Sequence, residues 1–318
     1  MSVASVTVTY NAAQVLVRHI EALQRQTRLL QEIIVVDNAS TDGTCMLLAE
    51  RYPQVTVLRM SENLGMAGAW AGGLRYAALE KRHEWVWTFD DDSVPKNDAL
   101  EALLKGIQSL ADANDEVGIV ASIAIHRDTG TCYPPFLWRE GPVRPPAELL
   151  RQPIVFADLV MASGCMVRRD VVERIGLPRA DFFMDFFDTE YCLRARSHGY
   201  RIAVITGSEL DHEIGNARWV RLPGYSRLRA EHTPWRQYYR ARNVTYAVWW
   251  LYPSRKGKRY VVRHLARRAV GLLLFDSNKL ACLKKMAQGF WDGRRGRLGM
   301  RFGPVECAAP RFETVQGV

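Results

Sequence analysis

Residues Trp85 to Pro95 read Trp-Val-Trp-Thr-Phe-Asp-Asp-Asp-Ser-Val-Pro, so five strand-forming residues run directly into three carboxylates. Aromatic and β-branched side chains favour a buried strand, and the proline ends it. Asp90, Asp91 and Asp92 therefore lie at the carboxyl end of a strand, where open α/β sheets bind their ligands. Because three adjacent carboxylates repel one another, we expect a divalent cation among them. A solvated acidic turn that caps the next helix is the alternative from this stretch alone.

The segments around this stretch alternate between strand and helix patterns. The expected strands lie at residues 3–10, 32–36, 55–60, 85–89, 117–123, 154–160 and 200–206. The expected helices lie at residues 12–26, 97–110, 169–175, 235–250, 258–275 and 278–290, and further helices end near residues 51, 81 and 198. Such alternation is typical of a mostly parallel sheet with right-handed crossovers. The predicted fold is therefore α/β, with a mostly parallel, Rossmann-like sheet flanked by helices.

Residues 133–153 interrupt this regular pattern. Six prolines fall in the segment, and we expect a long irregular loop of the kind that forms a lid or faces an acceptor. The six cysteines of the chain are scattered without close pairs. Their spacing argues against both a zinc site and a disulfide framework, so we expect reduced and mostly buried thiols.

The charge of the chain is distributed unevenly. Residues 218–301 hold 21 Lys or Arg against three acidic residues, whereas residues 1–217 hold 21 against 29. A basic C-terminal third of this kind indicates an anionic surface or a polyanion as partner. We therefore expect residues 1–230 to form a catalytic domain that binds donor and acceptor. Residues 231–318 would form a basic helical extension that contacts a membrane or another protomer.

The sequence also bears on where the protein works. No window of 18 uninterrupted apolar residues is present, and the first residues lack the pattern of a signal peptide. Both observations predict a cytoplasmic protein without a membrane span. Helices rich in arginine and lysine beside tryptophan, leucine and phenylalanine would suit peripheral binding to the anionic inner face of the cytoplasmic membrane.

Further candidates for chemistry follow other expected strands. Parallel strands place their carboxyl ends at one edge of a sheet, so these distant positions can share one cleft. Asp90 and Asp92 offer hard oxygen ligands, and His212 offers an imidazole, a set suited to Mn²⁺ or Mg²⁺ rather than to zinc. Such an ion bridges the phosphates of a nucleotide and neutralises the charge of a leaving diphosphate. A histidine in the core or on the surface is the alternative for His212.

Two more carboxylates have both a functional and a structural interpretation. Asp37 could accept hydrogen bonds from a base or ribose, or it could cap the next helix. Asp188 follows four phenylalanines whose apolar surroundings could raise its pKa into the range of a general base. Alternatively, Asp188 and Glu190 complement the dipole at a helix start.

Four motifs occur in order along the chain, at residues Val35–Thr44, Glu62–Gly68, Phe89–Ser93 and Asp185–Tyr200. Together they resemble the family 2 inverting glycosyltransferases of the GT-A fold. Within that family, the motifs are most similar to bacterial rhamnosyltransferases of O-antigen assembly and to galactofuranosyltransferases. Phe187 stands where some galactofuranosyl relatives carry a second acid, which favours the rhamnosyl branch.

The resemblance implies a role for individual residues. Asp37 would contact the nucleotide base, and Asp90 to Asp92 would form a DxD-type motif. Asp188 would be the catalytic base, with His212 as a further metal ligand. The other expected contacts to the nucleotide sugar are Tyr10, Asn11, Asn38, Asn63, Gly65 and Arg242. The expected contacts to the acceptor are Gly164, Asp188 and Glu190.

The implied function is metal-dependent, inverting transfer of a sugar from a nucleotide diphosphate to an acceptor hydroxyl. The donor would be dTDP-rhamnose, with UDP-galactofuranose next. The acceptor would be a growing cell-surface glycan or a polyprenyl-diphosphate-linked sugar, and the protein could self-associate. Two other functions stay open: a metal-dependent phosphoester hydrolase and a non-enzymatic nucleic-acid-binding protein that uses the basic third. No recognised nucleic-acid motif supports the latter.

Overall fold

The computed structural model describes residues 1–303 except residues 114, 128, 140, 213–216, 223, 224 and 231. For the strands at 217–222 and 225–230, the backbone alone is described. The first half of the chain folds as alternating strands and helices. They are β1 (Val3–Thr9), α1 (Ala13–Gln24), β2 (Glu32–Asp37), α2 (Thr44–Arg51), β3 (Thr56–Arg59), α3 (Gly65–Leu74), a π-helix (Arg75–Glu80), β4 (Trp85–Asp90), β5 (Val94–Pro95), α4 (Ala99–Asp112) and β6 (Val117–Ile125).

The second half begins with short, irregular pieces and ends with helices. The pieces are β7 (Cys132–Tyr133), β8 (Leu137–Trp138), β9 (Pro142–Val143), a 3₁₀ turn (Leu149–Arg151), β10 (Ile154–Ala157), β11 (Cys165–Arg168), α5 (Arg169–Ile175), a 3₁₀ turn (Ala180–Phe182), α6 (Phe187–Ser197) and β12 (Arg201–Asp211). The remaining elements are β13 (Ala217–Leu222), β14 (Tyr225–Ala230), α7 (Pro234–Tyr246), a π-helix (Ala247–Leu251), α8 (Arg255–Phe275) and α9 (Lys279–Arg294).

One large sheet organises the molecule, with the strand order β10-β12-β6-β11-β4-β1-β2-β3. Strands β4, β1, β2 and β3 are parallel, as the alternating pattern predicts. Apolar residues on successive positions of these strands point to opposite faces, and both faces are covered by helices. Helices α3, α5 and α6 pack on one face, and α1, α2 and α4 pack on the other. The α/β fold class is confirmed.

The centre of the sheet departs from the parallel pattern. Strand β11 lies between β4 and β6 and is antiparallel to both. Only four residues long, it follows Gly164 directly and reads as part of a loop in the sequence. Its insertion separates β4 from β6. The end of β4 that carries Asp90 is therefore separated from β6 and β12 by one additional strand.

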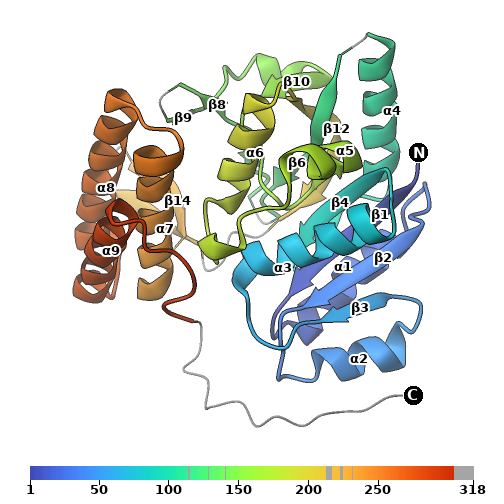
Figure 1. Ribbon diagram of the computed structural model, residues 1–318, viewed down its shortest axis with the longest axis horizontal. Coiled ribbons are helices and arrows are strands. Elements are labelled where there is room, and N and C mark those ends of the chain that lie inside the picture. Colours follow the sequence, from blue (N-terminus) through green and yellow to red (C-terminus); the bar gives the residue numbers. More distant parts are fainter. Residues whose placement is uncertain are drawn as a thin grey trace.

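The three C-terminal helices stand together on the side of the molecule away from β1, β2 and β3 (Figure 1). Helix α7 packs closely along α9, and α8 contacts both. All three coincide with helices expected from the sequence, which confirms the helical C-terminal extension. Among the residues that the structure describes, no helix combines the length and the apolarity needed to cross a bilayer.

Candidate active site

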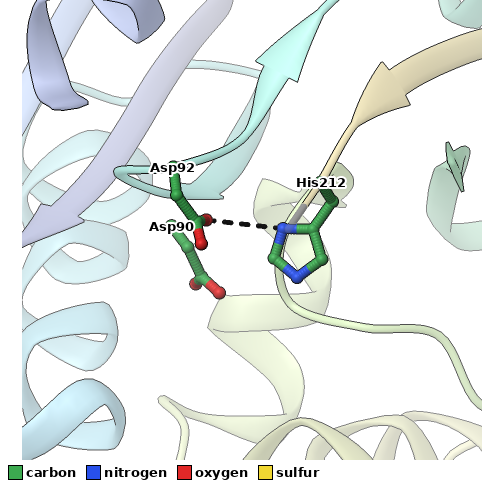
Figure 2. Close-up of side chains that lie close together, drawn as sticks. All are labelled: Asp90, Asp92 and His212. Atoms are coloured by element: carbon green, nitrogen blue, oxygen red, sulfur yellow. Dashed lines mark ion pairs between the residues drawn. The ribbon is translucent and has the colours of Figure 1, made fainter. Parts of the chain in front are cut away.

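An acidic cluster forms where β4 ends. Asp90 closes β4, Asp92 lies in the turn before β5, and His212 follows β12. Strand β5 pairs with the end of β12, so that Val94 is opposite Asp211 and the imidazole lies beside the turn. One ligand atom from each of the three side chains lies within 4.8 Å of the others. Figure 2 shows both carboxylates on the side of the turn that faces the imidazole.

The cluster has the chemistry of a divalent-cation site. Asp92 Oδ1 lies 3.4 Å from His212 Nδ1 (Figure 2) and, within the described residues, has no hydrogen-bond partner although it is buried. A buried carboxylate oxygen without a donor is costly, and a cation would satisfy it. Ser93 Oγ lies 2.8 Å from His212 Nδ1 and fixes the ring. Two carboxylates and one imidazole therefore fit Mn²⁺ or Mg²⁺.

The middle aspartate of the motif faces a different way. Asp91 Oδ2 accepts hydrogen bonds from Thr9 Oγ1 at 2.9 Å and from the backbone N–H of Tyr10 at 3.4 Å. Burial raises the pKa of Asp91 to about 7. Burial also raises the pKa of Asp90 to about 6, and the nearby Asp92 carboxylate contributes to this rise. The motif thus carries two outer carboxylates toward the cation cluster and ties the central one to the end of β1.

A cleft of about 1140 Å³ opens in front of this cluster. It is lined by the ends of β1 and β4, by the loop before α6, by residues 131–133 and 144, and by helices α7 and α8. The site residues that line it are Tyr10, Asn38, Asn63, Gly65, Asp90, Asp91, Asp92, Asp188 and His212. The cleft therefore extends beyond the first 230 residues, and the proline-rich loop reaches it as expected.

Asp188 faces the same cleft from the first turn of α6. Burial raises the pKa of Asp188 to about 6, and the negative charge of Asp185 adds to this effect. One carboxylate oxygen accepts a hydrogen bond from the backbone N–H of Thr189 at 2.7 Å. A carboxylate with a raised pKa at the edge of a cleft has the properties of a general base.

The loop before α6 has an unusual backbone. Phe183, Asp185 and Phe186 have φ angles of 62°, 57° and 68°, in the left-handed region that costs a non-glycine residue about 1–3 kcal/mol. Gly65 allows this loop to approach α3, because a Cβ on Gly65 would lie 2.2 Å from the carbonyl oxygen of Phe183. Strain of this kind persists only where surrounding contacts hold it.

Helix α7 supplies those contacts. The side-chain amide of Asn243 lies 2.7 Å from the carbonyl oxygens of both Met184 and Asp185 and 3.0 Å from that of Phe182. Arg242 is fully buried beside it and donates to the carbonyl of Phe182 at 2.8 Å. Arg242 does not line the cleft in the part of the chain described, so its predicted contact with the nucleotide sugar is not what the geometry shows. Its guanidinium holds the loop instead.

This clamp predicts a large effect on stability. We expect Asn243→Ala to lower the free energy of unfolding by about 2–3 kcal/mol, because buried carbonyl groups lose their donor. Urea unfolding at pH 7.5 measures the change. The control is Gln108→Ala, whose exposed amide donates to Asp112 and whose loss is expected to cost less than about 0.5 kcal/mol. A loss in Asn243→Ala no larger than in the control would contradict the clamp.

Two residues predicted to contact the nucleotide sugar, Asn38 and Asn63, form a hydrogen bond with each other. Asn38 Nδ2 donates to Asn63 Oδ1 at 3.0 Å, and the backbone N–H of Gly65 donates to the same oxygen at 2.9 Å. These contacts fix the loop after β2 against the entrance of α3. Asn38, Asn63 and Gly65 consequently form one wall of the cleft beside Tyr10.

Besides Arg242, four predicted site residues are not among the residues that line the cleft, namely Asn11, Asp37, Gly164 and Glu190. Asp37 is fully buried and accepts hydrogen bonds from the backbone N–H of Ser40 at 3.3 Å. Asn11 accepts a hydrogen bond from the backbone N–H of Thr41 at 2.7 Å. Both side chains thus hold the turn after β2, and Asp37 does not cap α2, whose N-cap residue is Gly43.

Two of the three predicted acceptor contacts, Glu190 and Gly164, have other contacts. Glu190 is buried and pairs with Arg194 at 3.0 Å. Gly164 has a φ of 84°, and a Cβ there would lie 2.1 Å from Leu210. The geometry therefore gives Glu190 and Gly164 packing roles behind Asp188.

Arg236, which was not predicted as a site residue from the sequence, forms an ion pair with Asp185 near the cation cluster. Arg236 Nε lies 3.1 Å from Asp185 Oδ2, and both residues line the cleft. The Asp185 carboxylate raises the pKa of Arg236, and the charges of Asp90 and Asp92 contribute to this rise. The position of Arg236 in the first turn of a helix opened by Pro234 was the available signal, since that turn points toward the cleft.

The family model described as Glycosyl transferase family 2 matches residues 5–176, which is more than half of the chain. The chain belongs to glycosyl transferase family 2. The family and the GT-A fold expected from the four motifs are thereby confirmed.

Relatives of this family 2 glycosyltransferase include two enzymes of the expected branches. This chain is 29% identical over 269 residues to the dTDP-rhamnosyl transferase RfbF of Shigella flexneri, and the match covers 84% of this chain and 87% of the relative. It is 38% identical over 93 residues to the galactofuranosyltransferase GlfT1 of Mycobacterium tuberculosis, covering 29% of this chain and 30% of that protein.

Solved structures support the fold of the glycosyltransferase. GalNAc-T7, crystallised with UDP, GalNAc and Mn²⁺, superposes with a TM-score of 0.62 at 15% identity, over 93% of this chain and 56% of that one. Staphylococcus aureus TarS superposes with a TM-score of 0.52 at 14% identity, over 84% of this chain and 43% of that one. At these identities the likeness concerns the fold.

Proposed function

We propose that the protein transfers a sugar, with inversion, from a nucleotide diphosphate to a hydroxyl of a cell-surface glycan or lipid-linked acceptor. The observation that supports this most is that Asp188 and the cluster of Asp90, Asp92 and His212 line one cleft. A base for the incoming hydroxyl and a cation site for the leaving diphosphate are the two requirements of such a reaction.

The proposed donor is dTDP-rhamnose, and UDP-galactofuranose is the next candidate. Similarity to the dTDP-rhamnosyl transferase RfbF extends over most of both chains, whereas the match to GlfT1 covers less than a third of each. Phe187 in place of a second acid before Asp188 is consistent with this order.

The proposed mechanism is a single in-line displacement. Asp188 accepts the proton of the acceptor hydroxyl. At the same time the hydroxyl oxygen forms a bond to the anomeric carbon, and the bond between that carbon and the donor's diphosphate oxygen breaks. Asp90, Asp92 and His212 would hold a Mn²⁺ or Mg²⁺ ion, which when bound neutralises charge on the diphosphate. Arg236 lines the same part of the cleft and adds a fixed positive charge.

A panel of nucleotide sugars tests the proposal. With Mn²⁺ and a bacterial lipid extract as acceptor, we expect dTDP release from dTDP-rhamnose, and we expect EDTA to stop it. The extract should stimulate release at least tenfold, since the acceptor supplies the nucleophile. Release of equal rate without acceptor would instead indicate the hydrolase, and no release from any donor would overturn the proposed function.

Helices α8 and α9 carry a surface suited to a membrane. At the corner between them, Val270, Leu273, Leu274 and Leu280 are 55%, 49%, 64% and 81% exposed. Lysine and arginine are abundant on both helices. An apolar corner between two helices rich in basic side chains fits the headgroup region of an anionic bilayer. We propose that residues 231–318 attach the protein peripherally to the inner face of the cytoplasmic membrane, while residues 1–230 bind the donor.

This surface predicts selective binding to anionic vesicles. The protein is expected to co-sediment with vesicles that contain about 30% phosphatidylglycerol, and a smaller fraction of it should co-sediment with neutral vesicles. Replacing both Leu273 and Leu274 with Glu should reduce the bound fraction severalfold. The control Leu29→Glu changes a leucine that is 80% exposed on another part of the surface. Equal recovery with both vesicle types, or dimerisation lost in the double variant, would overturn the membrane proposal.

A further inference from the structure

The wall of the cleft contributed by the C-terminal helices is rich in arginine. Arg236 and Arg240 of α7 line the cleft, and so do His264, Arg267 and Arg268 of α8. Side chains three and four positions apart lie on one face of a helix. Each helix therefore turns one basic face toward the same space.

The four arginines of this wall differ in the contacts that their guanidinium groups make. Arg236 pairs with Asp185, and Arg268 Nε donates to Gln237 Oε1 at 2.6 Å. Within the described part of the chain, neither Arg240 nor Arg267 forms an ion pair with a carboxylate. The positive charge on this wall thus exceeds the negative charge that the described residues place against it.

Two histidines report how concentrated this charge is. Burial and the charges of Arg240, Arg268 and Arg267 lower the pKa of His264 to about 4. Burial and the charges of Arg240 and Arg236 likewise lower the pKa of His232 to about 3. Both imidazoles are therefore neutral at pH 7, and three guanidinium groups lie near the ring of His264. Groups held in this way are typical of a binding site for an anion.

The part of this wall that α8 contributes is separate in the fold from the wall that would bind the donor. Tyr10, Asn38 and Asn63 approach the cleft from β1, β2 and the start of α3, whereas α8 belongs to the group of helices on the other side of the molecule (Figure 1). The donor's diphosphate is accounted for by the cation cluster and Arg236. Arg240, whose charge also helps to lower the pKa of Asp185, and Arg267 line the cleft without a carboxylate at ion-pair distance among the described residues, so a second ligand can bind them.

We propose that Arg240 and Arg267 form a second anion site, which binds a phosphate or diphosphate group of the acceptor while the donor occupies the cation cluster. Guanidinium groups bind phosphate oxygens in pairs and keep their charge at every physiological pH. The acceptor is accordingly a phosphate-bearing molecule rather than a neutral glycan. The proposal rests on the proposed function for the identity of the second substrate.

Calorimetric titration tests the second site on the full chain loaded with Mn²⁺ and dTDP. The probes are inorganic phosphate, octyl phosphate and, as a neutral control, octyl glucoside below its micellar concentration. We expect both phosphates to bind without displacing dTDP, and octyl glucoside not to bind. The double variant Arg240→Gln and Arg267→Gln should weaken phosphate binding at least tenfold. Octyl phosphate bound at least tenfold more tightly than inorganic phosphate identifies a lipid-linked source, and equal affinities identify a soluble one.

The matched control is Arg263→Gln, an exposed arginine of the same helix that is not among the residues lining the cleft. It should leave phosphate binding within twofold of the native value. Competition between octyl phosphate and dTDP, absence of phosphate binding, or an equal loss in Arg263→Gln would each overturn the second site.

Failure of the second site is distinguishable from failure of the proposed function. If the native protein turns over dTDP-rhamnose but the double variant binds phosphate normally, the second site alone is wrong. If no nucleotide sugar is used, the proposed function fails, and the titration with octyl phosphate still reports on the arginine wall. In transfer assays the double variant should raise the KM for a phosphorylated acceptor at least tenfold and leave the KM for the donor unchanged.

Discussion

Asp188→Asn is expected to lower the rate of sugar transfer by a factor of about 10²–10⁴ while nucleotide binding remains. Asparagine has nearly the same shape as aspartate, but its amide cannot accept the proton of an acceptor hydroxyl. The hydrogen bond from the backbone N–H of Thr189 can still be made to the amide oxygen. Single-turnover transfer and titration with dTDP and Mn²⁺ separate the two effects.

The raised pKa of Asp188 makes this prediction sharper. Because the carboxylate form is the base, the rate of the native protein should rise with pH through about 6 and become constant above it. A bound cation favours the carboxylate and would move this midpoint lower. Burial destabilises the charged form in the folded state, and this cost is present above the pKa. Asp188→Asn removes it, so its Tm at pH 7.5 should equal or exceed the native value.

The control for this variant is Asp181→Asn. Asp181 pairs with Arg179 at 2.6 Å in the preceding segment and does not line the cleft among the described residues. Its loss should change the transfer rate by less than threefold, a limit of about 0.6 kcal/mol. Transfer by Asp188→Asn within tenfold of the native rate would remove Asp188 from the role of base.

Asp92→Ala is expected to remove the dependence of donor binding on the metal. Asp92 Oδ1 is the buried cluster oxygen that has no hydrogen-bond donor within the described residues. Loss of this ligand should weaken binding of dTDP in the presence of Mn²⁺ by a factor on the order of 100 and leave binding in EDTA unchanged. Titration calorimetry in the two buffers measures the difference.

Asp211→Asn is the matched control for Asp92→Ala. Asp211 adjoins His212 but pairs with Lys96 at 3.0 Å on the surface. It should retain metal-dependent binding of dTDP within about twofold, because exposed ion pairs contribute less than about 1 kcal/mol. A normal Mn²⁺ requirement in Asp92→Ala would exclude it as a ligand.

Much of the donor half could be predicted from local sequence. The strands β1, β2 and β4 are rich in β-branched and aromatic residues, and such strands are typically buried on both faces of a sheet. Side chains placed directly after these strands then meet at one edge. The convergence of Asp90, Asp92 and His212 followed from this rule and needed no long-range information.

Other features depend on contacts that a local pattern does not contain. Strand β11 is a strand only because β4 and β6 bind it from both sides. Arg242 is a charged residue in a helix and would ordinarily be placed on the surface or against a ligand. It is buried because carbonyl groups of a strained loop, distant in sequence, require donors. The resemblance that suggested a substrate contact for Arg242 could not reveal this.

The hydrogen bonds from α7 to the loop of residues 182–185 have a consequence for protein engineering. A chimaera with altered acceptor preference could be built by replacing α7, α8 and α9 with the corresponding helices of a relative. Asn243 binds backbone carbonyls, so its bonds depend on the path of the loop rather than on the loop's side chains. A graft that carries the helices without their native loop would misalign Asp188. The exchangeable unit is therefore discontinuous, and it comprises the helices together with the short segment that delivers the base.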